Sequence, residues 1–271
     1  MMSAYRYLYI TWQDPTSRRW FPVGRLTVKP DEYIFQYIGG AKEAEKEGGF
    51  QPIGTFSDLY GEYKSSMLFP LFATRMLSPS RPDYEDFVSW MGLSGAEIDP
   101  IELLARSGGK SVTDRFEIFP FPKKNQNGKY HSHFFAHGLR HLPASAVQRI
   151  NLLKQGEQLR LANEFQNPFD KNAMLLITED RVAVGYCPRY LLHHVKDIQS
   201  QSEKLCVKVE KDVSAEVPLS FRLLCSLTAD WKENELPFSN PQYQPLIKHQ
   251  CMSYTERTCT DQPSICRDGE K

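Results

Sequence analysis

The chain has 271 residues, of which 41% are hydrophobic and 24% charged, and its 33 Lys and Arg residues balance 33 Asp and Glu residues. This composition excludes a chain that is disordered throughout, because such chains combine low hydrophobicity with a large net charge. The zero net charge argues against a protein that coats polyanions non-specifically, since that affinity needs many cationic contacts. The length predicts two domains, and a local basic groove on one of them remains compatible with overall neutrality.

Neither a secretory leader nor a membrane span is predicted. Residues 1–14 are rich in tyrosine and lack a basic segment followed by an apolar one. The longest apolar patch, residues 67–77, contains Pro70 and Arg75 and is far shorter than the roughly 20 residues that cross a bilayer. We therefore expect a cytoplasmic protein.

The first half of the chain opens with the pattern of a β-sheet. Residues 5–12 and 33–38 alternate with the period of a strand and place aromatic residues on one face. Between them, residues 20–26 form a further short strand, in which Pro22 indicates an edge position or a bulge.

Two short helices follow this sheet. Residues 84–91 carry apolar side chains at helical spacing and end at Gly92. Pro100 begins a second helix, which Gly108 stops. Together with the strands they predict an α+β module over residues 1–122, built on a small mixed sheet.

Residues 120–129 are the best candidate for a boundary between the modules. They contain two prolines, three lysines and the turn-forming run Asn125-Gln126-Asn127-Gly128, which suits either a linker or a hairpin turn.

The second module, residues 130–232, is predicted to be a small β-barrel with one or two short helices. Its expected strands cover residues 133–139, 157–164, 173–178, 182–187, 205–209 and 219–227, and its helices cover 143–153 and 190–198. From residue 237 to 271 periodicity is lost, so we expect a loosely ordered tail.

The most specific motif of the chain runs from Gln166 to Ala173, with the sequence Gln-Asn-Pro-Phe-Asp-Lys-Asn-Ala. It is followed by an apolar strand and then by Val184-Gly185-Tyr186-Cys187-Pro188-Arg189. This order resembles the HIRAN domain, and the segment 135–141 resembles that family's opening strand, so the likeness covers residues 133–228.

The resemblance implies a small barrel that grips the exposed 3′ end of a single DNA strand. By position, Phe169 would stack on the terminal base and Asp170 would accept a hydrogen bond from the terminal 3′-hydroxyl. Arg140, Lys171 and Asn172 would lie near phosphates or support the turn. The complete set expected to bind DNA is Arg140, His141, Asn167, Phe169, Asp170, Lys171, Asn172, Tyr186 and Arg189.

The chemistry of these residue types agrees with the resemblance. An exposed aromatic ring offers a base about 1–3 kcal/mol of stacking without reading sequence. A carboxylate repels phosphates but accepts from a free hydroxyl, so Asp170 could make a generic groove selective for strand ends. The plainer alternative is an ordinary turn, in which Asn167 and Asp170 bond their own backbone and Asn172 supports it.

Residues 18–118 are similar to the N-terminal subdomain of HipA-type toxin kinases. The similarity rests on the segments 21–26, 33–37, 49–53 and 68–72. It implies a small α+β interaction module, whereas no phosphate-binding loop or catalytic constellation of a kinase is present in the sequence.

Several polar residues gather around the expected helix termini, where backbone N–H groups and cations can hold phosphates. They are Arg75, Ser78, Ser80, Arg81, Arg106, Ser107, Lys110 and Ser111. Solvated helix caps are the favoured interpretation.

No cofactor is expected, although two groups of residues are of metal-binding types. His131, His133 and His137 share one face of an expected strand but lack a spaced carboxylate or cysteine partner. His249, Cys251, Cys259 and Cys266 do not have the spacing of paired zinc ligands. The other cysteines, Cys187, Cys206 and Cys225, are interpreted as reduced thiols in apolar positions.

These observations favour a non-catalytic protein that binds single-stranded DNA at a free 3′ end and acts as a recruiter or sensor in DNA repair or defence. One alternative is a regulatory protein-interaction component of a toxin–antitoxin or kinase-like system, docking through residues 1–122. A second alternative is a metal-dependent nuclease or part of a DNA-processing hydrolase complex, for which no complete motif is present in the sequence.

Overall fold

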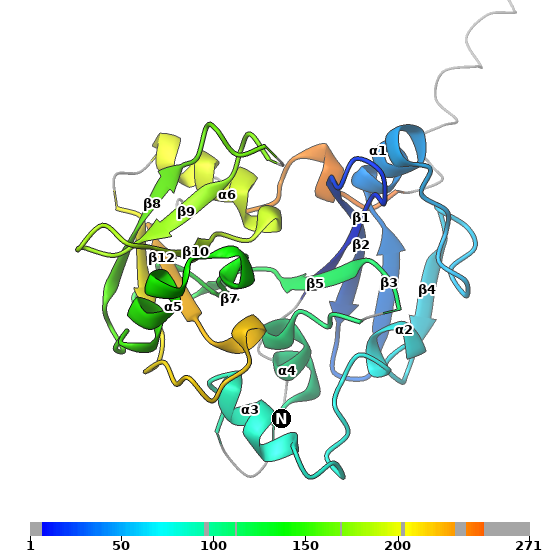
Figure 1. The fold of residues 1–271 in the computed structure, drawn as a ribbon. Helices are drawn as coiled ribbons and strands as arrows, with labels where there is room; N and C mark the ends of the chain where they lie inside the picture. The colour runs from blue at the N-terminus through cyan, green and yellow to red at the C-terminus, as the bar shows by residue number, and fades with distance from the viewer. Residues whose placement is uncertain are drawn as a thin grey trace, which may run out of the picture.

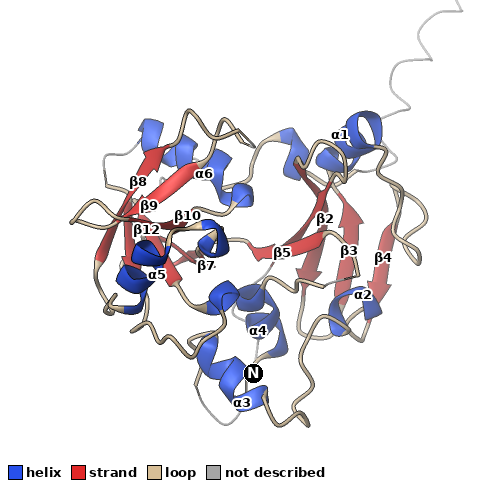
Figure 2. Ribbon diagram, in the orientation of Figure 1, coloured by secondary structure: helices blue, strands red, loops and turns tan. Residues whose placement is uncertain are grey.

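The computed structural model describes residues 7–94, 98–111, 113–168, 170–201, 204–230 and 237–246. Two antiparallel sheets lie side by side, each with its own hydrophobic core, and short helices cover them (Figures 1 and 2). The α+β class expected from the sequence is confirmed. We call residues 7–120 the N-terminal module and residues 123–230 the C-terminal module.

The N-terminal module is built on five strands in the order β4-β3-β2-β1-β5. Their bounds are β1 Tyr7–Gln13, β2 Trp20–Val28, β3 Tyr33–Tyr37, β4 Glu62–Ser65 and β5 Phe116–Pro120. Pro22 lies at a bulge, because Ile10 pairs with Gly24 whereas Thr11 pairs with Pro22. Strand β2 lies between β3 and β1, so it is an interior strand, and the bulge accommodates its proline.

Aromatic side chains fill the core of this module. Phe35 is fully buried and stacks on Phe56 with ring centroids 4.2 Å apart. The Tyr37 hydroxyl donates to the carbonyl of Phe56 at 2.8 Å and accepts from the amide of Ile53, so its buried polar atom is satisfied. These rings secure the loop that follows α1 (Gly39–Gly48) against the sheet.

Helices α2 (Pro70–Ala73), α3 (Tyr84–Trp90) and α4 (Pro100–Ser107) lie between β4 and β5 along the chain. The start and end of α4 follow the signals in the sequence. The Asp99 carboxylate accepts from the amide of Ile101 at 2.9 Å, Pro100 occupies the first turn, and Gly108 adopts a left-handed φ of 73°. This end leads the chain directly towards β5.

The segment 120–129 is a hairpin and not a free linker. Strand β6 (Lys123–Lys124) pairs with β7 (Tyr130–Phe135), and the amide of Asn125 donates to the carbonyl of Lys129 at 2.8 Å. The Asn125 side chain also accepts from the amides of Asn127 and Lys129. The run of turn-forming residues therefore forms the tight turn between β6 and β7.

The C-terminal module is a seven-stranded sheet in the order β10-β9-β8-β11-β12-β7-β6. The remaining bounds are β8 Gln158–Asn163, β9 Met174–Ile177, β10 Ala183–Tyr186, β11 Cys206–Val209, β12 Leu224–Ala229, η1 Leu139–His141, α5 Ala144–Asn151, α6 Arg189–Gln201 and η2 Leu219–Phe221. The sheet is barrel-like but does not close as a continuous ladder. Instead, His137 and Tyr186 form an isolated bridge in which each amide donates to the other carbonyl at 2.9 Å.

The expected strand over residues 219–227 is wrong in its first half. Residues 219–221 form a 3-10 turn after Pro218, and strand β12 begins only at Leu224. The Arg222 guanidinium donates to the carbonyls of Val217 and Ala215, which holds the chain in a turn. Alternation alone did not reveal these backbone contacts.

The expectation of a loose tail is also wrong for residues 237–246, which include the 3-10 turn η3 (Pro241–Tyr243). Phe238 and Tyr243 are buried against Tyr9 of the N-terminal sheet. The amide of Leu246 donates to the carbonyl of Tyr37 at 2.9 Å. Two aromatic side chains thus anchor a segment that has no periodicity, and residues 247–271 lie outside the described residues.

The two modules also share apolar contacts. Phe119 of β5 stacks on Tyr190 of α6 with ring centroids 4.7 Å apart and an interplanar angle of 9°. At another point, Leu224 and Phe135 pack with Val88 and Met91 around α3. These contacts position the modules on either side of a common cleft. In the described part of the chain, no helix has the length and apolar character of a membrane span.

Candidate nucleic-acid interface

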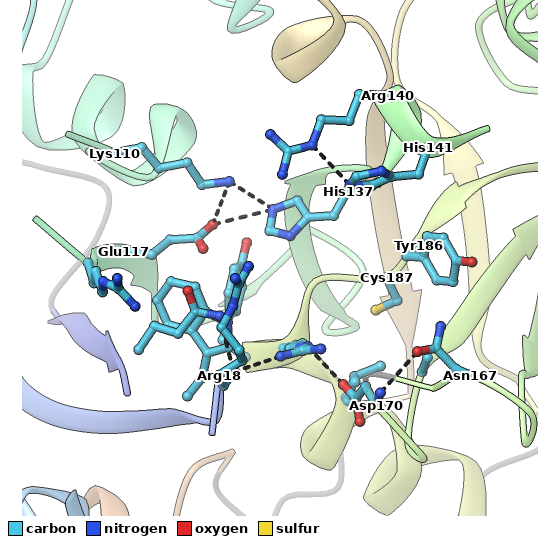
Figure 3. Close-up of a pocket in the computed structure, with 18 of the residues that line it drawn as sticks. Arg18, Lys110, Glu117, His137, Arg140, His141, Asn167, Asp170, Tyr186 and Cys187 are labelled. Atoms are coloured by element: carbon cyan, nitrogen blue, oxygen red, sulfur yellow. Dashed lines mark hydrogen bonds and ion pairs between the residues drawn. The ribbon is translucent and has the colours of Figure 1, made fainter. Parts of the chain in front are cut away.

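A cleft with a volume of about 1050 Å³ lies between the two modules (Figure 3). Six residues that the sequence analysis selected line it: Arg140, His141, Asn167, Asp170, Tyr186 and Arg189. The opposite wall includes Arg18, Trp20, Lys110, Arg115 and Glu117 of the N-terminal module. Lys171 and Asn172 are exposed and do not belong to the lining, and Phe169 lies outside the described residues.

The motif turn has the local hydrogen bonds expected of turn-forming residues. The amide of Asp170 donates to the Asn167 side chain at 2.9 Å, and the amide of Asn172 donates to the Asp170 carboxylate at 2.9 Å. Lys196 of α6 donates to the Asn172 side chain at 2.7 Å. The turn interpretation and the binding interpretation are therefore compatible, because a rigid turn presents Asp170 to the cleft.

The carboxylate of Asp170 has a cationic partner that the sequence analysis did not identify. Its Oδ2 lies 2.9 Å from Nε of Arg189, at the start of α6. The same guanidinium donates through Nη1 to the backbone carbonyl of Arg18 at 2.7 Å. Arg189 thus connects the motif turn with the β1–β2 turn of the other module.

A second polar link joins the modules at the far side of the cleft. Glu117 of β5 is buried, and its Oε1 lies 3.1 Å from Nζ of Lys110 and 3.4 Å from Nε2 of His137. Burial acts to raise the pKa of Glu117, but the charges of His137 and Lys110 outweigh burial and hold that pKa below its usual value. Figure 3 shows the three side chains converging. A motif search could not find this link, because its members come from separate segments.

Gly138 lines the cleft in a conformation that glycine favours. It has a left-handed φ of 77°, and a Cβ added there would lie 2.6 Å from the Tyr186 ring. The residue is followed by η1, from which Arg140 donates to the ring of His141 at 3.0 Å. Burial raises the pKa of Tyr186 above its usual value, and Glu164 acts in the same direction.

One exposed aromatic residue near the motif was missed. Phe165 is 80% exposed and lies between the cleft-lining residues Glu164 and Asn167. A large apolar side chain at such exposure is available for a flat ligand such as a base. The sequence feature that could have identified Phe165 is its position in the loop between β8 and β9, where it does not belong to the alternating pattern of either strand.

The polar residues around the helix termini differ in their surroundings. Arg75 has a nearly buried side chain and pairs with Asp114, while it also donates to the carbonyl of Gly109 at 2.9 Å. It therefore has a structural role. Lys110 and Ser111, by contrast, line the cleft.

The candidate metal ligands do not assemble in the described part of the chain, where no three His, Cys, Asp or Glu side chains are placed to hold an ion. The rings of His131 and His133 lie 4.4 Å apart, whereas His137 belongs to the cleft. The candidates in the tail, His249, Cys251, Cys259 and Cys266, lie outside the described residues. Burial raises the pKa of the Cys187 and Cys225 thiols, which keeps both protonated.

Comparison with protein families supports the resemblance that the motif at residues 166–173 indicated. Residues 129–227 match the HIRAN domain. The HIRAN match does not extend into the N-terminal module, so the likeness of residues 18–118 to HipA-type kinases stays a prediction. No curated protein matches the chain.

Two solved structures resemble part of the chain. The HIRAN domain of human HLTF has 19% identity, a TM-score of 0.28, and coverage of 39% of this chain and 78% of that one. A protein from Lactobacillus plantarum has 20% identity, a TM-score of 0.28, and coverage of 38% and 97%.

Proposed function

We propose that this protein binds single-stranded DNA in the cleft between its modules, prefers a free 3′ end and does not cut the strand. The HIRAN match supports DNA binding as the general role. The observation that carries the proposal is that residues from four segments line one cleft: Arg140 and His141 of η1, Asn167 and Asp170 of the motif turn, Tyr186 of β10 and Arg189 of α6.

Preference for an end follows from the chemistry of Asp170. An ionised carboxylate has about four acceptor positions, and the turn amide of Asn172 and the guanidinium of Arg189 occupy two of them. The remaining positions suit a donor such as a terminal hydroxyl. A terminal phosphate has no comparable donor and would meet the carboxylate as a second anion, so it is disfavoured at the same place.

Cationic side chains in the same wall supply affinity for the strand. Arg140 is exposed, and the Arg189 guanidinium is held in position by Asp170. Guanidinium groups bind phosphate oxygens through pairs of parallel hydrogen bonds. The pair of Asp170 and Arg189 therefore combines selectivity for a hydroxyl with attraction for the adjacent phosphate.

The test compares two otherwise identical labelled strands, one with a 3′-hydroxyl and one with a 3′-phosphate, by fluorescence anisotropy. The wild type should bind the hydroxyl strand more tightly, and the ratio of the two affinities should fall towards one in Asp170→Ala. Asp31→Ala is the matched control, because Asp31 is an exposed carboxylate in the β2–β3 turn and is not part of the cleft lining. Equal affinity of the wild type for both strands would contradict end recognition.

We further propose a role as a recruiter or sensor in DNA repair or in defence against foreign DNA. The non-catalytic part of the proposal is tested by incubating the protein with single-stranded and double-stranded DNA in Mg²⁺ or Mn²⁺. Intact strands are expected. Metal-dependent cleavage that copurifies with the protein would favour the nuclease alternative.

A further inference from the structure

We propose that the N-terminal module forms the second wall of the DNA site, with Arg18 and Arg115 binding the phosphates of nucleotides that precede the captured end. This inference rests on the proposed function, because it assigns the path of the same strand. It also gives residues 7–120 a direct part in nucleic-acid binding, in addition to any role in docking a protein.

Both arginines are presented by backbone that tertiary contacts hold in place. Arg18 has a left-handed φ of 62°, its amide donates to the carbonyl of Asp14 at 3.0 Å, and its own carbonyl accepts from Arg189. Arg115 directly precedes β5, and its carbonyl accepts from the amide of Gln13 at 2.9 Å. Both side chains are exposed and line the cleft, as do Asp170 and Arg140 of the facing module.

The acidic residues of the cleft do not neutralise these two cations. Three of the carboxylates that line the cleft have a cationic partner: Asp114 pairs with Arg75, Glu117 with Lys110 and Asp170 with Arg189. The fourth, Glu164, accepts a hydrogen bond from the side-chain amide of Asn167. Among the described residues, Arg18, Arg115 and Arg140 form no salt bridge. Three guanidinium groups on two walls are thus available for anionic groups of a ligand.

Aromatic side chains accompany the arginines on the N-terminal wall. Trp20 and Phe116 are partly exposed and line the cleft. Alternation of cations with aromatic faces is the pattern that binds single strands, because the cations follow the backbone while the rings stack on bases. A duplex has no free base faces, so the chemistry of this wall favours a single strand.

Each module then has its own function within one cleft. Asp170 and Arg189 on one side recognise the terminal nucleotide, and Arg18 and Arg115 on the other side hold the chain that leads to it. A very short strand should reach only the first pair. A longer strand should gain affinity from the second, without any change in preference for the hydroxyl end.

The experiment measures anisotropy with 3′-hydroxyl strands of two to ten nucleotides over a range of salt concentrations. The double variant Arg18→Ala and Arg115→Ala should lose the gain in affinity that longer strands give, about 10- to 30-fold near 100 mM salt. The slope of log affinity against log salt should fall by about 1.4, since each phosphate contact on a single strand contributes about 0.7. The preference for a 3′-hydroxyl over a 3′-phosphate should be retained.

Arg19→Ala is the matched control. Arg19 adjoins Arg18 and is exposed, but it pairs with Glu47 and is not part of the cleft lining. The corresponding Lys substitutions should keep part of the salt slope, which separates lost charge from disturbed folding. If the double variant binds long strands with unchanged affinity and slope while Asp170→Ala loses end selectivity, this inference is overturned and the proposed function stands. If the wild type binds no strand of any length, both are overturned.

Discussion

The guanidinium of Arg189 lies 2.9 Å from the carboxylate of Asp170 and at the same time donates to the backbone carbonyl of Arg18. One side chain thereby connects the motif turn of the C-terminal module to a turn of the N-terminal module. Asp170 is accordingly part of a bridge across the cleft as well as a candidate acceptor for a strand end.

Arg189→Ala should reduce affinity for a single strand about tenfold, or about 1.4 kcal/mol. The reason is twofold: a phosphate loses its cation, and Asp170 becomes an uncompensated negative charge beside the strand. Arg189→Lys should recover only part of the affinity, because lysine lacks the planar fork. The double variant Arg189→Ala and Asp170→Ala should lose less binding free energy than the sum of the losses in the two single variants. Strictly additive losses in anisotropy titrations would argue against coupling between Arg189 and Asp170.

Phe165→Ala should weaken binding of a single strand about 5- to 150-fold, corresponding to about 1–3 kcal/mol of base stacking. Its side chain is 80% exposed, so the free energy of unfolding should not change appreciably. Met67→Ala serves as control, since Met67 is 76% exposed but does not adjoin the cleft-lining residues in sequence. Unaltered anisotropy curves for Phe165→Ala would exclude the ring from binding.

Gly138→Ala should destabilise the protein by about 1–3 kcal/mol, because an alanine strains the left-handed backbone at this position. The new methyl group would also displace the ring of Tyr186, which a Cβ would approach within 2.6 Å. Urea denaturation measures the loss of stability. The comparison is Gly128→Ala, which shares a positive φ but has nothing within 4 Å of the added Cβ, and should cost less.

Stability should fall as the pH falls from about 6.5 to about 4. Burial and the neighbouring His133 lower the pKa of His131 from 6.5 to about 4, so the unfolded chain binds more protons in that window. Burial also lowers the pKa of His133, in the same direction. The neighbouring Glu210 raises the pKa of both histidines, whereas the positive charges of Arg106 and Lys123 lower the pKa of His131.

His131→Asn should flatten this part of the stability profile in urea titrations. The effect should be about 1–2 kcal/mol at most, because solvent screens the partly exposed ring of His131. Glu210 acts in a different window: its hydrogen bond to His133 lowers its pKa to about 2, so its contribution is complete above its usual pKa and is lost as the pH falls towards 2. An identical profile for wild type and His131→Asn between pH 4 and 6.5 would contradict the assignment.

Local signals in the sequence predicted many of the elements correctly. Pro100 and Gly108 bound α4, and Pro22 marks a bulge, because each acts through its own backbone geometry. The motif from Gln166 to Ala173 indicated a turn through the same local chemistry, whereas its candidate site residues came from the resemblance to the HIRAN domain. Local signals gave a wrong prediction where side-chain contacts determine the backbone. At Arg222, for example, the guanidinium holds a turn where a strand was expected.

By itself, the sequence determined the α+β composition, the positions of most strands and helices, and the HIRAN motif in the second half, since these depend on periodicity and on turn chemistry close along the chain. Tertiary structure alone decided that Arg18 and Arg115 line the same cleft as Asp170, that Arg189 bridges the modules, and that Phe238 anchors the segment after residue 237. Such contacts depend on how two sheets pack across an interface, and no spacing along the chain encodes them.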